Sequence, residues 1–398
     1  MRFRTFATAA LILVLAVASG TIATPRPAAA APTGYQLRWS DEFDGTTVDT
    51  AKWSYRTDSP WQAWSQQRAE NVAVGGGAMT ITLCPANRAG SACDKPVDAG
   101  DRFTGGGLIS KARLRYGYYE TRARTNVGSG WHSAFWAAQA GGTGARTEID
   151  GFEIDSHVPS EISHNIIGWD QGVRLSSGFR DDLGFDTSAA WHVYGFEWTE
   201  AGVRIYVDGV LYDKWLPSYP QSEYAHDYLN LWLSTIAVDL NNSPGVDVSA
   251  LPGKVQFDYA RYYQRDAYGD NDDPAGGYAE TGTGWAASSL PSFARQTNRY
   301  NCASAATARW TVTPPVSGNY RAYFHRVGAD GGQPDAPVAL RDGGTTLAAT
   351  SVDLSVAGNA WLPIGGSVAL TGGHAYTIGI DRTGSGCIRA DAVKLVRQ

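Results

Sequence analysis

Short runs of alternating or β-branched residues, each bounded by turn residues, constrain the fold of this chain most strongly. Examples are 79–83 and 203–207, and the second runs into Asp208-Gly209, a strong signal for a two-residue hairpin. No segment predicts a helix longer than two turns. Charged residues make up only 18% of the chain, which is fewer than long solvent-exposed helices would bring. We therefore expect an all-β protein of many short antiparallel strands, a sandwich or jelly roll.

The length of 398 residues predicts two domains. An acidic run with Gly and Pro at 267–278 has no apolar periodicity and is interpreted as a linker. It would separate a first domain of 34–266 from a second of 279–398, which we expect to be a smaller β-sandwich. Of the 14 Trp residues, most precede the linker, so the aromatic surplus belongs to the first domain.

The N-terminal segment 1–31 has the pattern of a secretory signal peptide. Arg2 and Arg4 precede an apolar run at 7–18, and 28–31 is a stretch of alanines that suits cleavage. We expect a secreted, extracellular protein. No other stretch has the roughly 18 apolar residues that a membrane span needs, so no membrane association is expected after cleavage.

Four cysteines in an exported chain predict two disulfides, with three possible connectivities. Cys84 and Cys93 are close in sequence, whereas Cys302 and Cys387 lie in the second half. We predict the pairs 84–93 and 302–387, one in each domain. A metal site is the alternative, but the chain has no Cys-x-x-Cys pair and no adjacent His cluster to support it.

Composition also restricts the partners. The formal net charge is −6, which provides no cationic surface for nucleic acid or an anionic membrane. The excess of Trp favours neutral ligands with apolar faces that stack on aromatic rings, above all sugars. We expect a monomer that binds a polysaccharide and no nucleic acid.

Four carboxylates fall within eight residues of one predicted strand: Glu148, Asp150, Glu153 and Asp155. Side chains alternate along a strand, so Glu148 and Asp150 share a face and Glu153 would point away. One extra residue in a β-bulge would return Glu153 to their face, and Gly151 is a residue that tolerates a bulge.

Carboxyl groups that share a concave face have their proton affinities driven apart, which suits separate acid and nucleophile roles. A separation of about 5–5.5 Å is typical of a retaining glycosidase, and about 6.5–9.5 Å of an inverting one. A solvated acidic strand edge is the alternative that the spacing leaves open.

The pattern Glu148-x-Asp150-x-x-Glu153 resembles the catalytic signature of glycoside hydrolase family 16, the laminarinases, lichenases, agarases and carrageenases. The resemblance spans about 36–264 and is carried by the ordered segments 39–45, 116–120, 130–136, 191–198 and 257–263. It implies a concanavalin-like β-sandwich jelly roll whose concave sheet forms a sugar-binding cleft.

The resemblance also implies the roles. Glu148 would be the nucleophile and Glu153 the general acid and base, while Asp150 would hydrogen-bond the nucleophile and keep the pKa of the acid high. Asp155 lies outside the signature and is taken as structural. The implied function is a secreted, retaining endo-β-glycosidase acting on a β-1,3-glucan or β-galactan. It needs no cofactor for catalysis. A lectin-like polysaccharide-binding protein and a transglycosylase are the alternatives.

Substrate-binding residues follow from the same resemblance. Trp131 and Trp136 are an odd number of residues apart, so without a bulge only one of them faces the sugar. The family position favours Trp131 for the cleft. Trp232 belongs to an Asn-Leu-Trp stretch like that of the lichenases. The remaining candidates are Asn165 and Trp169, on the strand after the catalytic one, and His132 and His164, which could equally be structural.

Family members often carry a structural calcium ion on the convex face. The corresponding oxygen donors here would be Glu42, the carbonyl of Gly77, and Asp258. The alternative is that the two carboxylates cap turns or pair with arginine.

The second domain resembles golvesin-like domains through 278–285 and 388–395. A carbohydrate-binding module and a stabilising or spacer domain are both compatible with this resemblance.

Overall fold

The computed structural model describes residues 33–58, 64–85, 93, 102–140, 146–170, 173–212, 224–238, 240–273, 276–293, 297–303 and 305–398. The predicted signal peptide, 1–31, lies outside these residues. Within them no helix is long and apolar enough to cross a membrane. The regular structure of the described residues consists of strands and two short 3₁₀ turns, η1 (Ala69–Asn71) and η2 (Val248–Ala250). The expectation of an all-β protein is confirmed.

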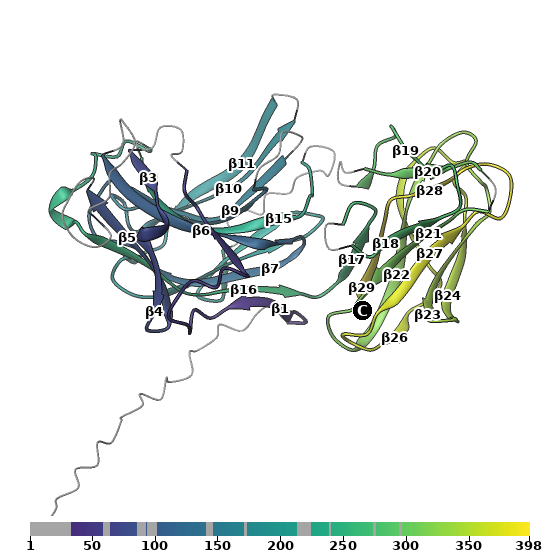
Figure 1. The fold of residues 1–398 in the computed structure, drawn as a ribbon, viewed down its shortest axis with the longest axis horizontal. Coiled ribbons are helices and arrows are strands. Elements are labelled where there is room, and N and C mark those ends of the chain that lie inside the picture. Colours follow the sequence, from purple (N-terminus) through teal and green to yellow (C-terminus); the bar gives the residue numbers. More distant parts are fainter. Residues whose placement is uncertain are drawn as a thin grey trace, which may run out of the picture.

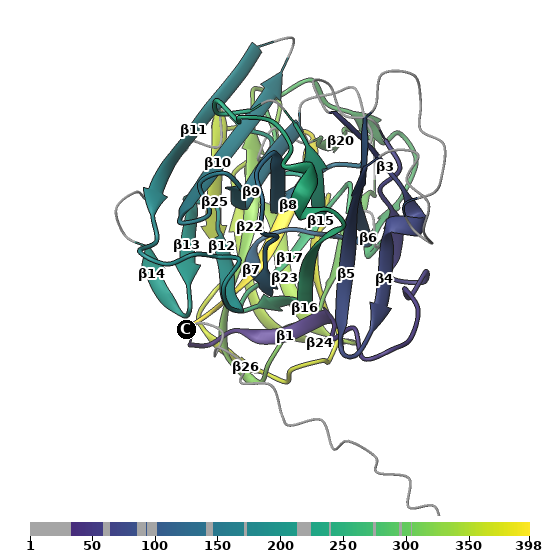
Figure 2. The same ribbon diagram turned by 90° about the vertical axis from the view of Figure 1, so that its left-hand side faces the viewer.

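The first domain is built from two curved layers that face each other (Figure 1, Figure 2). One layer has the order β11 (Val173–Asp182), β10 (Glu161–Asp170), β9 (Arg146–Asp155), β8 (Trp131–Ala138), β15 (Leu229–Ala237) and β6 (Phe103–Leu114). The other has the order β5 (Ala78–Pro85), β16 (Gly253–Gln264), β7 (Gly117–Arg124), β12 (His192–Trp198), β13 (Val203–Val207) and β14 (Val210–Tyr212). Pairing between β5 and β6 joins the layers. The shorter strands β2 (Trp53–Tyr55) and β3 (Ser65–Gln67) pair with β6, β1 (Gln36–Asp41) with β16, and β4 (Val72–Gly75) with β5.

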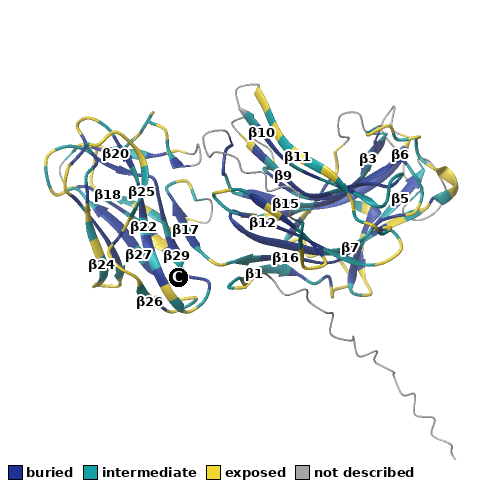
Figure 3. Ribbon diagram, turned by 180° about the vertical axis from the view of Figure 1, so that it is seen from behind, coloured by how far each residue is buried: buried dark blue, intermediate teal, exposed yellow. Residues whose placement is uncertain are grey.

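An aromatic core fills the space between the layers, and the facing strands are buried along most of their length (Figure 3). Phe152 of β9 packs on Tyr194 of β12 with ring centroids 4.6 Å apart, and Phe135 of β8 packs on Phe196 at 5.3 Å. Such pairs contribute about 0.5–1.5 kcal/mol beyond the burial of their apolar area. Part of the excess of aromatic residues therefore serves this core.

The second domain is a smaller sandwich with its own core. One sheet contains β17 (Ala267–Asp270), β29 (Ala392–Arg397), β22 (Gly318–Gly328), β25 (Gly358–Pro363) and β26 (Val368–Leu370). The facing sheet contains β18 (Tyr278–Thr281), β21 (Thr307–Val312), β27 (Tyr376–Asp381), β23 (Ala336–Asp342) and β24 (Thr345–Val352). A third, small sheet is formed by β19 (Ala286–Ala287), β20 (Arg299–Asn301) and β28 (Ile388–Ala390).

The prediction of a linker over the whole of 267–278 is wrong at Tyr278, which begins β18, and at its first four residues. They form β17, which pairs with β29 from Ala267 opposite Leu395 to Asp270 opposite Ala392. The acidic character misled the interpretation, because Asp270 is fully buried and its carboxylate accepts a hydrogen bond from Arg115 at 2.9 Å. The carboxyl group of Asp270 thus pairs with a buried cation of the first domain and is not exposed to water.

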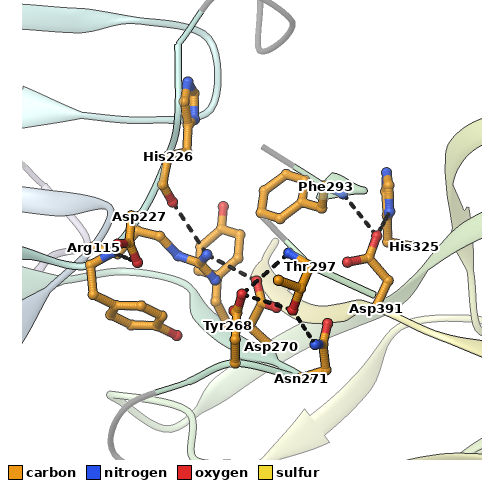
Figure 4. Close-up of polar contacts among 12 residues, drawn as sticks. Arg115, His226, Asp227, Tyr268, Asp270, Asn271, Phe293, Thr297, His325 and Asp391 are labelled. Carbon is orange, nitrogen blue, oxygen red and sulfur yellow. Dashed lines mark hydrogen bonds and ion pairs between the residues drawn. The ribbon is translucent and has the colours of Figure 1, made fainter. Parts of the chain in front are cut away.

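The two domains pack against each other through charged and aromatic side chains (Figure 4). Arg115, at the end of β6, also donates to the carbonyl of His226 and lies 5.5 Å from the ring centre of Phe293 in the second domain. Glu200 of the first domain accepts hydrogen bonds from Tyr268 and from Lys394 of β29, each at 2.7 Å. The interface is thus a specific packed contact.

Both predicted disulfides are present. Cys84 is joined to Cys93, next to the place where β5 meets β6, and Cys302 is joined to Cys387 in the second domain.

Candidate active site

A β-bulge at Gly151 shapes the strand that carries the carboxylates. On β8, Phe135 lies opposite Phe152 and Trp136 opposite Asp150, so Gly151 has no partner of its own. The register with β10 shifts over the same stretch, between Ser163 opposite Glu153 and Asn165 opposite Asp150. The structure therefore has the extra residue at the position that the sequence predicted.

The bulge brings the carboxylates to one face of β9. Glu148, Asp150 and Glu153 line a cavity of about 180 Å³ on the concave layer. Ile149, Phe152 and Ile154 alternate with them and point into the aromatic core, where each is at most 1% exposed. The strand thus separates a polar concave face from an apolar one. This arrangement is not that of a solvated acidic strand edge.

Burial and mutual repulsion raise the proton affinity of the carboxylates. Burial first, and then the negative charge of Glu153, raises the pKa of Glu148 to about 7. Burial and the charges of Glu153 and Glu148 raise the pKa of Asp150 well above its usual range. Closely packed carboxylates in one cavity cannot all be ionised without cost, so the cluster retains a proton near neutral pH.

Two tryptophans form a stacked pair beside the carboxylates. Trp136 of β8 lies opposite Trp232 of β15, with ring centroids 4.5 Å apart and planes 26° apart. The side chain of Arg56 lies near both rings, at 5.6 and 5.7 Å from their centres. Ser234 accepts hydrogen bonds from Arg56 at 3.0 Å and from Nε1 of Trp136 at 3.1 Å. Both indoles are half-buried, which leaves apolar surface for a sugar ring.

The prediction that Trp131 lines the cleft is wrong. Trp131 is 2% exposed, belongs to the core, and packs edge-on against Phe103 with centroids 6.1 Å apart. The odd spacing did allow only one of the two tryptophans on each face, but Trp136 is the one on the carboxylate side. The choice of Trp131 followed the family position, and it failed because the spacing itself fixes only the relative orientation of two residues on a strand.

The prediction that His164 binds substrate is also contradicted. His164 is 3% exposed and packs on Phe179 of β11, with ring centroids 5.0 Å apart. Its neighbour Asn165 lies opposite Asp150, so alternation along β10 turns His164 to the other side of the sheet. Burial lowers the pKa of His164 to about 4, so the ring is neutral and structural.

The other candidates lie on the concave face. Nδ2 of Asn165 donates to Oε2 of Glu153 at 2.5 Å, and Nε2 of His132 lies 3.1 Å from Oε1 of the same carboxylate. Trp169 lies opposite Arg146, whose guanidinium is 4.6 Å from the indole centre. Asp155, taken from the sequence as structural, contacts Nδ1 of His132 at 2.8 Å.

Sequence reasoning missed five residues that line the cavity: Arg56, Ala134, Ser234, Ile236 and Leu240. Ser234 and Ile236 alternate with Trp232 along β15, so the strand period could have found them once Trp232 was placed. Arg56 follows β2, far from the catalytic strand in sequence, and no motif marked it.

A larger crevice, of about 280 Å³, lies between the two domains and includes Glu200, Tyr268 and Lys394 in its lining. Glu200 is already engaged by Tyr268 and Lys394 across the domain interface. The crevice therefore offers no counterpart to the three carboxylates of β9, and we assign the chemistry to the smaller cavity.

The calcium donors predicted from the family resemblance contact arginines. Both carboxylate oxygens of Glu42 accept hydrogen bonds from Arg261, at 2.9 and 2.6 Å, and Asp258 accepts from Arg122 at 2.9 Å. Within the described residues no group of three or more His, Cys, Asp or Glu side chains could hold a metal ion. The contacts fit the arginine alternative better than calcium, which stays an untested prediction for Glu42, Gly77 and Asp258.

The chain matches the models of two known protein families. Residues 62–261, just over half of the chain, match the model of glycosyl hydrolases family 16. The chain belongs to this family. The resemblance seen in the sequence is confirmed, and with it the assignment as a glycoside hydrolase and the jelly-roll fold. Residues 268–397 match the Golvesin C-terminal domain.

Individual family 16 relatives are distant in sequence. The chain is 27% identical over 277 residues to glucan endo-1,3-beta-glucosidase A1 of Niallia circulans, covering 61% of this chain and 40% of that protein. It is 28% identical over 263 residues to a beta-glucanase of Rhodothermus marinus, covering 58% and 85%. The crystal structure of SCLam, a non-specific endo-β-1,3(4)-glucanase from family GH16, is 28% identical with a TM-score of 0.49, covering 59% and 93%. The chain thus spans less than half of the Niallia protein.

Proposed function

We propose that the protein is a secreted, retaining endo-β-glycosidase that hydrolyses a β-linked polysaccharide by double displacement. Glu148 is the nucleophile, and Glu153 is the general acid and base. The observation that carries the proposal is the common face of Glu148, Asp150 and Glu153 on β9, created by the bulge at Gly151.

The chemistry takes place in two steps. A carboxylate oxygen of Glu148 attacks the anomeric carbon while the glycosidic bond breaks and Glu153 gives its proton to the leaving oxygen. Glu153, now a carboxylate, takes a proton from water, and the water oxygen attacks the anomeric carbon and releases Glu148. Hydrogen bonds from Asn165 and His132 fix the carboxyl group of Glu153, as both proton transfers require.

Asp150 lies between the two catalytic residues and is 2% exposed. Burial and the charges of Glu153 and Glu148 raise the pKa of Asp150, which favours a protonated carboxyl group among the three. We expect Asp150 to tune the protonation of the pair rather than to react with substrate.

The substrate class is a β-1,3-glucan or a β-galactan. Both named relatives are glucanases, which supports the glucan. The stacked pair Trp136 and Trp232 supports a pyranose whose apolar face lies on an aromatic ring. Secretion is supported by the signal peptide predicted at 1–31.

The test is a reducing-end assay on laminarin, lichenan, agarose, carrageenan and β-1,3-galactan, with the Glu148→Gln variant as control. Release of oligosaccharides by the wild-type protein and none by the variant supports the proposal. Binding without release by either protein would favour the lectin-like alternative. Products longer than the substrate, formed when an acceptor oligosaccharide is added, would favour the transglycosylase.

A further inference from the structure

A series of hydrogen bonds connects Glu153, through His132 and Asp155, to Arg180 on β11. His132 contacts Oε1 of Glu153 through Nε2, at 3.1 Å, and Oδ1 of Asp155 through Nδ1, at 2.8 Å. The second oxygen of Asp155 accepts from Arg180 at 2.7 Å and from the side-chain amide of Asn241. Five side chains from three strands and one loop thus form one connected network around the imidazole of His132.

In this series of hydrogen bonds, His132 and Asp155 are shielded from water, whereas Arg180 is partly exposed. The side chains of His132 and Asp155 are 9% and 6% exposed, and that of Arg180 is 35% exposed. Arg180 also pairs with the half-exposed Glu161 at 3.2 Å. A buried hydrogen-bonded ion pair is costly to break, so the orientation of the imidazole is well determined.

The charge of His132 depends on its two carboxylate neighbours. Burial alone would lower its pKa, but hydrogen bonds with Asp155 and Glu153 raise the pKa of His132 to about 10. Burial would raise the pKa of Asp155, yet the hydrogen bond from His132 and the charge of His132 keep that pKa below its usual value. Asp155 therefore stays ionised and His132 keeps a proton at neutral pH.

One proton can occupy two positions between His132 and Glu153. In the first form the imidazolium donates from Nε2 to the Glu153 carboxylate. In the second form the proton lies on Glu153, which donates it to a neutral imidazole. Asp155 accepts from Nδ1–H in both forms, so it fixes the tautomer that turns Nε2 toward Glu153.

We propose that His132 is a positioning residue that holds the catalytic proton at Glu153, oriented by Asp155 and Arg180. The inference rests on the proposed function and deepens it. In glycosylation the shared proton passes through Glu153 to the leaving oxygen, leaving neutral His132 beside an ionised Glu153. In deglycosylation Glu153 takes a proton from the attacking water, which restores the singly protonated pair.

Other charged groups face the same space and must be counted in any pH profile. They are Glu148 and Asp150 on β9, Arg174 and Arg180 on β11, Arg146 at the start of β9, and Arg56 after β2. The shared proton itself lies between His132 and Glu153, so His132→Gln removes one of its two sites directly.

The experiment measures kcat/KM against pH for the wild type, His132→Gln and Asp155→Asn. Each is assayed on the polysaccharide and on an aryl β-glycoside with a good leaving group, which needs no acid in the first step. On the polysaccharide, the alkaline limb should move to lower pH by about one unit or more in His132→Gln, and activity at pH 8 should fall at least about tenfold. Asp155→Asn should shift the limb in the same direction by less. With the aryl glycoside, the rate of the first step, in which Glu148 is glycosylated, should be nearly the same in both variants as in the wild type.

Two controls make the result decisive. His192→Gln removes another imidazole bonded to a carboxylate, that of Asp208 at 2.8 Å, in the opposite layer, and should leave the pH profile unchanged. Glu153→Gln tests the proposed function itself: if it retains polysaccharide activity, the function is wrong. If Glu153→Gln is inactive while His132→Gln and Asp155→Asn keep the wild-type alkaline limb, only the role of His132 is overturned. If His132→Gln lowers kcat/KM equally on the polysaccharide and on the aryl glycoside and leaves the alkaline limb in place, the proposal is also overturned. That result would indicate that His132 is purely structural.

Discussion

A Cβ atom placed on Gly151 would lie 2.4 Å from Cδ1 of Phe196. The residue that allows the bulge on the catalytic strand therefore also touches the aromatic core between the layers. The position of the carboxylates depends on this contact, because Phe196 belongs to β12 of the opposite layer and packs on Tyr119 with centroids 4.4 Å apart.

Gly151→Ala should destabilise the fold and reduce activity together. The methyl group would overpack the core beside Phe196, at a cost of about 1–3 kcal/mol in the free energy of unfolding. Urea denaturation measures this cost. Gly75→Ala is the matched control, since nothing lies within 4 Å of its added Cβ. Equal stability of the two variants would contradict the packing account.

Trp136→Ala should affect substrate binding, whereas Trp131→Ala should affect stability. Loss of the half-buried Trp136 removes part of the proposed sugar platform and should raise KM about tenfold, the equivalent of about 1.4 kcal/mol. Loss of the buried Trp131 leaves a core cavity and should cost about 3–5 kcal/mol of stability. Steady-state kinetics combined with urea unfolding separates the two effects. A larger rise in KM for a folded Trp131→Ala protein than for Trp136→Ala would reverse our placement.

Glu148→Gln should stabilise the protein more at pH 8 than at pH 5. Burial and the charge of Glu153 raise the pKa of Glu148 to about 7 in the folded state, so the folded protein binds more protons than the unfolded chain between about pH 4.5 and pH 7. Stability of the wild type therefore falls as pH rises through this window. The variant lacks this loss, which we put at about 2 kcal/mol after allowing for partial exposure. Thermal unfolding at both pH values tests it, and a gain that is equal at pH 5 and pH 8 would rule it out.

Arg115 and Asp270 should be strongly coupled across the domain interface. Their side chains are 1% and 0% exposed, so removal of either one leaves a buried unpaired charge and should cost about 3–5 kcal/mol. The double variant Arg115→Met/Asp270→Asn should lose much less than the sum of the single losses. A double-mutant cycle by denaturant unfolding provides the coupling energy, and additive losses would show that the contact does not hold the domains together.

Chelation should leave the melting temperature unchanged. Glu42 and Asp258 already pair with Arg261 and Arg122, so their charges are compensated without a metal. Differential scanning calorimetry with EDTA, followed by added calcium, measures the effect. A melting temperature that falls with EDTA and is restored by calcium would establish the calcium site instead.

The sequence predicted the features that follow from local periodicity. The strands, the bulge at Gly151 and the common face of the carboxylates depend on alternation over a few residues, and the structure has them. Both disulfide pairs were also predictable, since only a few connectivities existed.

Features set by distant partners could not be predicted in this way. Whether Trp131 or Trp136 faces the cleft depends on which side of β8 meets β12, and the burial of Asp270 depends on Arg115 in another domain. Arg56 enters the cavity only because β2 pairs with β6. Each of these outcomes requires the tertiary arrangement.

The most direct test of the central claim is the anomeric configuration of products formed when azide rescues the two catalytic variants. Glu148→Ala and Glu153→Ala would be incubated with azide and an activated aryl β-glycoside of the cleaved polymer's repeat unit, and the glycosyl azides identified by NMR. We predict the α-azide from Glu148→Ala, where azide replaces the nucleophile, and the β-azide from Glu153→Ala, where azide attacks the glycosyl intermediate on Glu148. The α-azide from Glu153→Ala, or the β-azide from Glu148→Ala, would contradict the assignment.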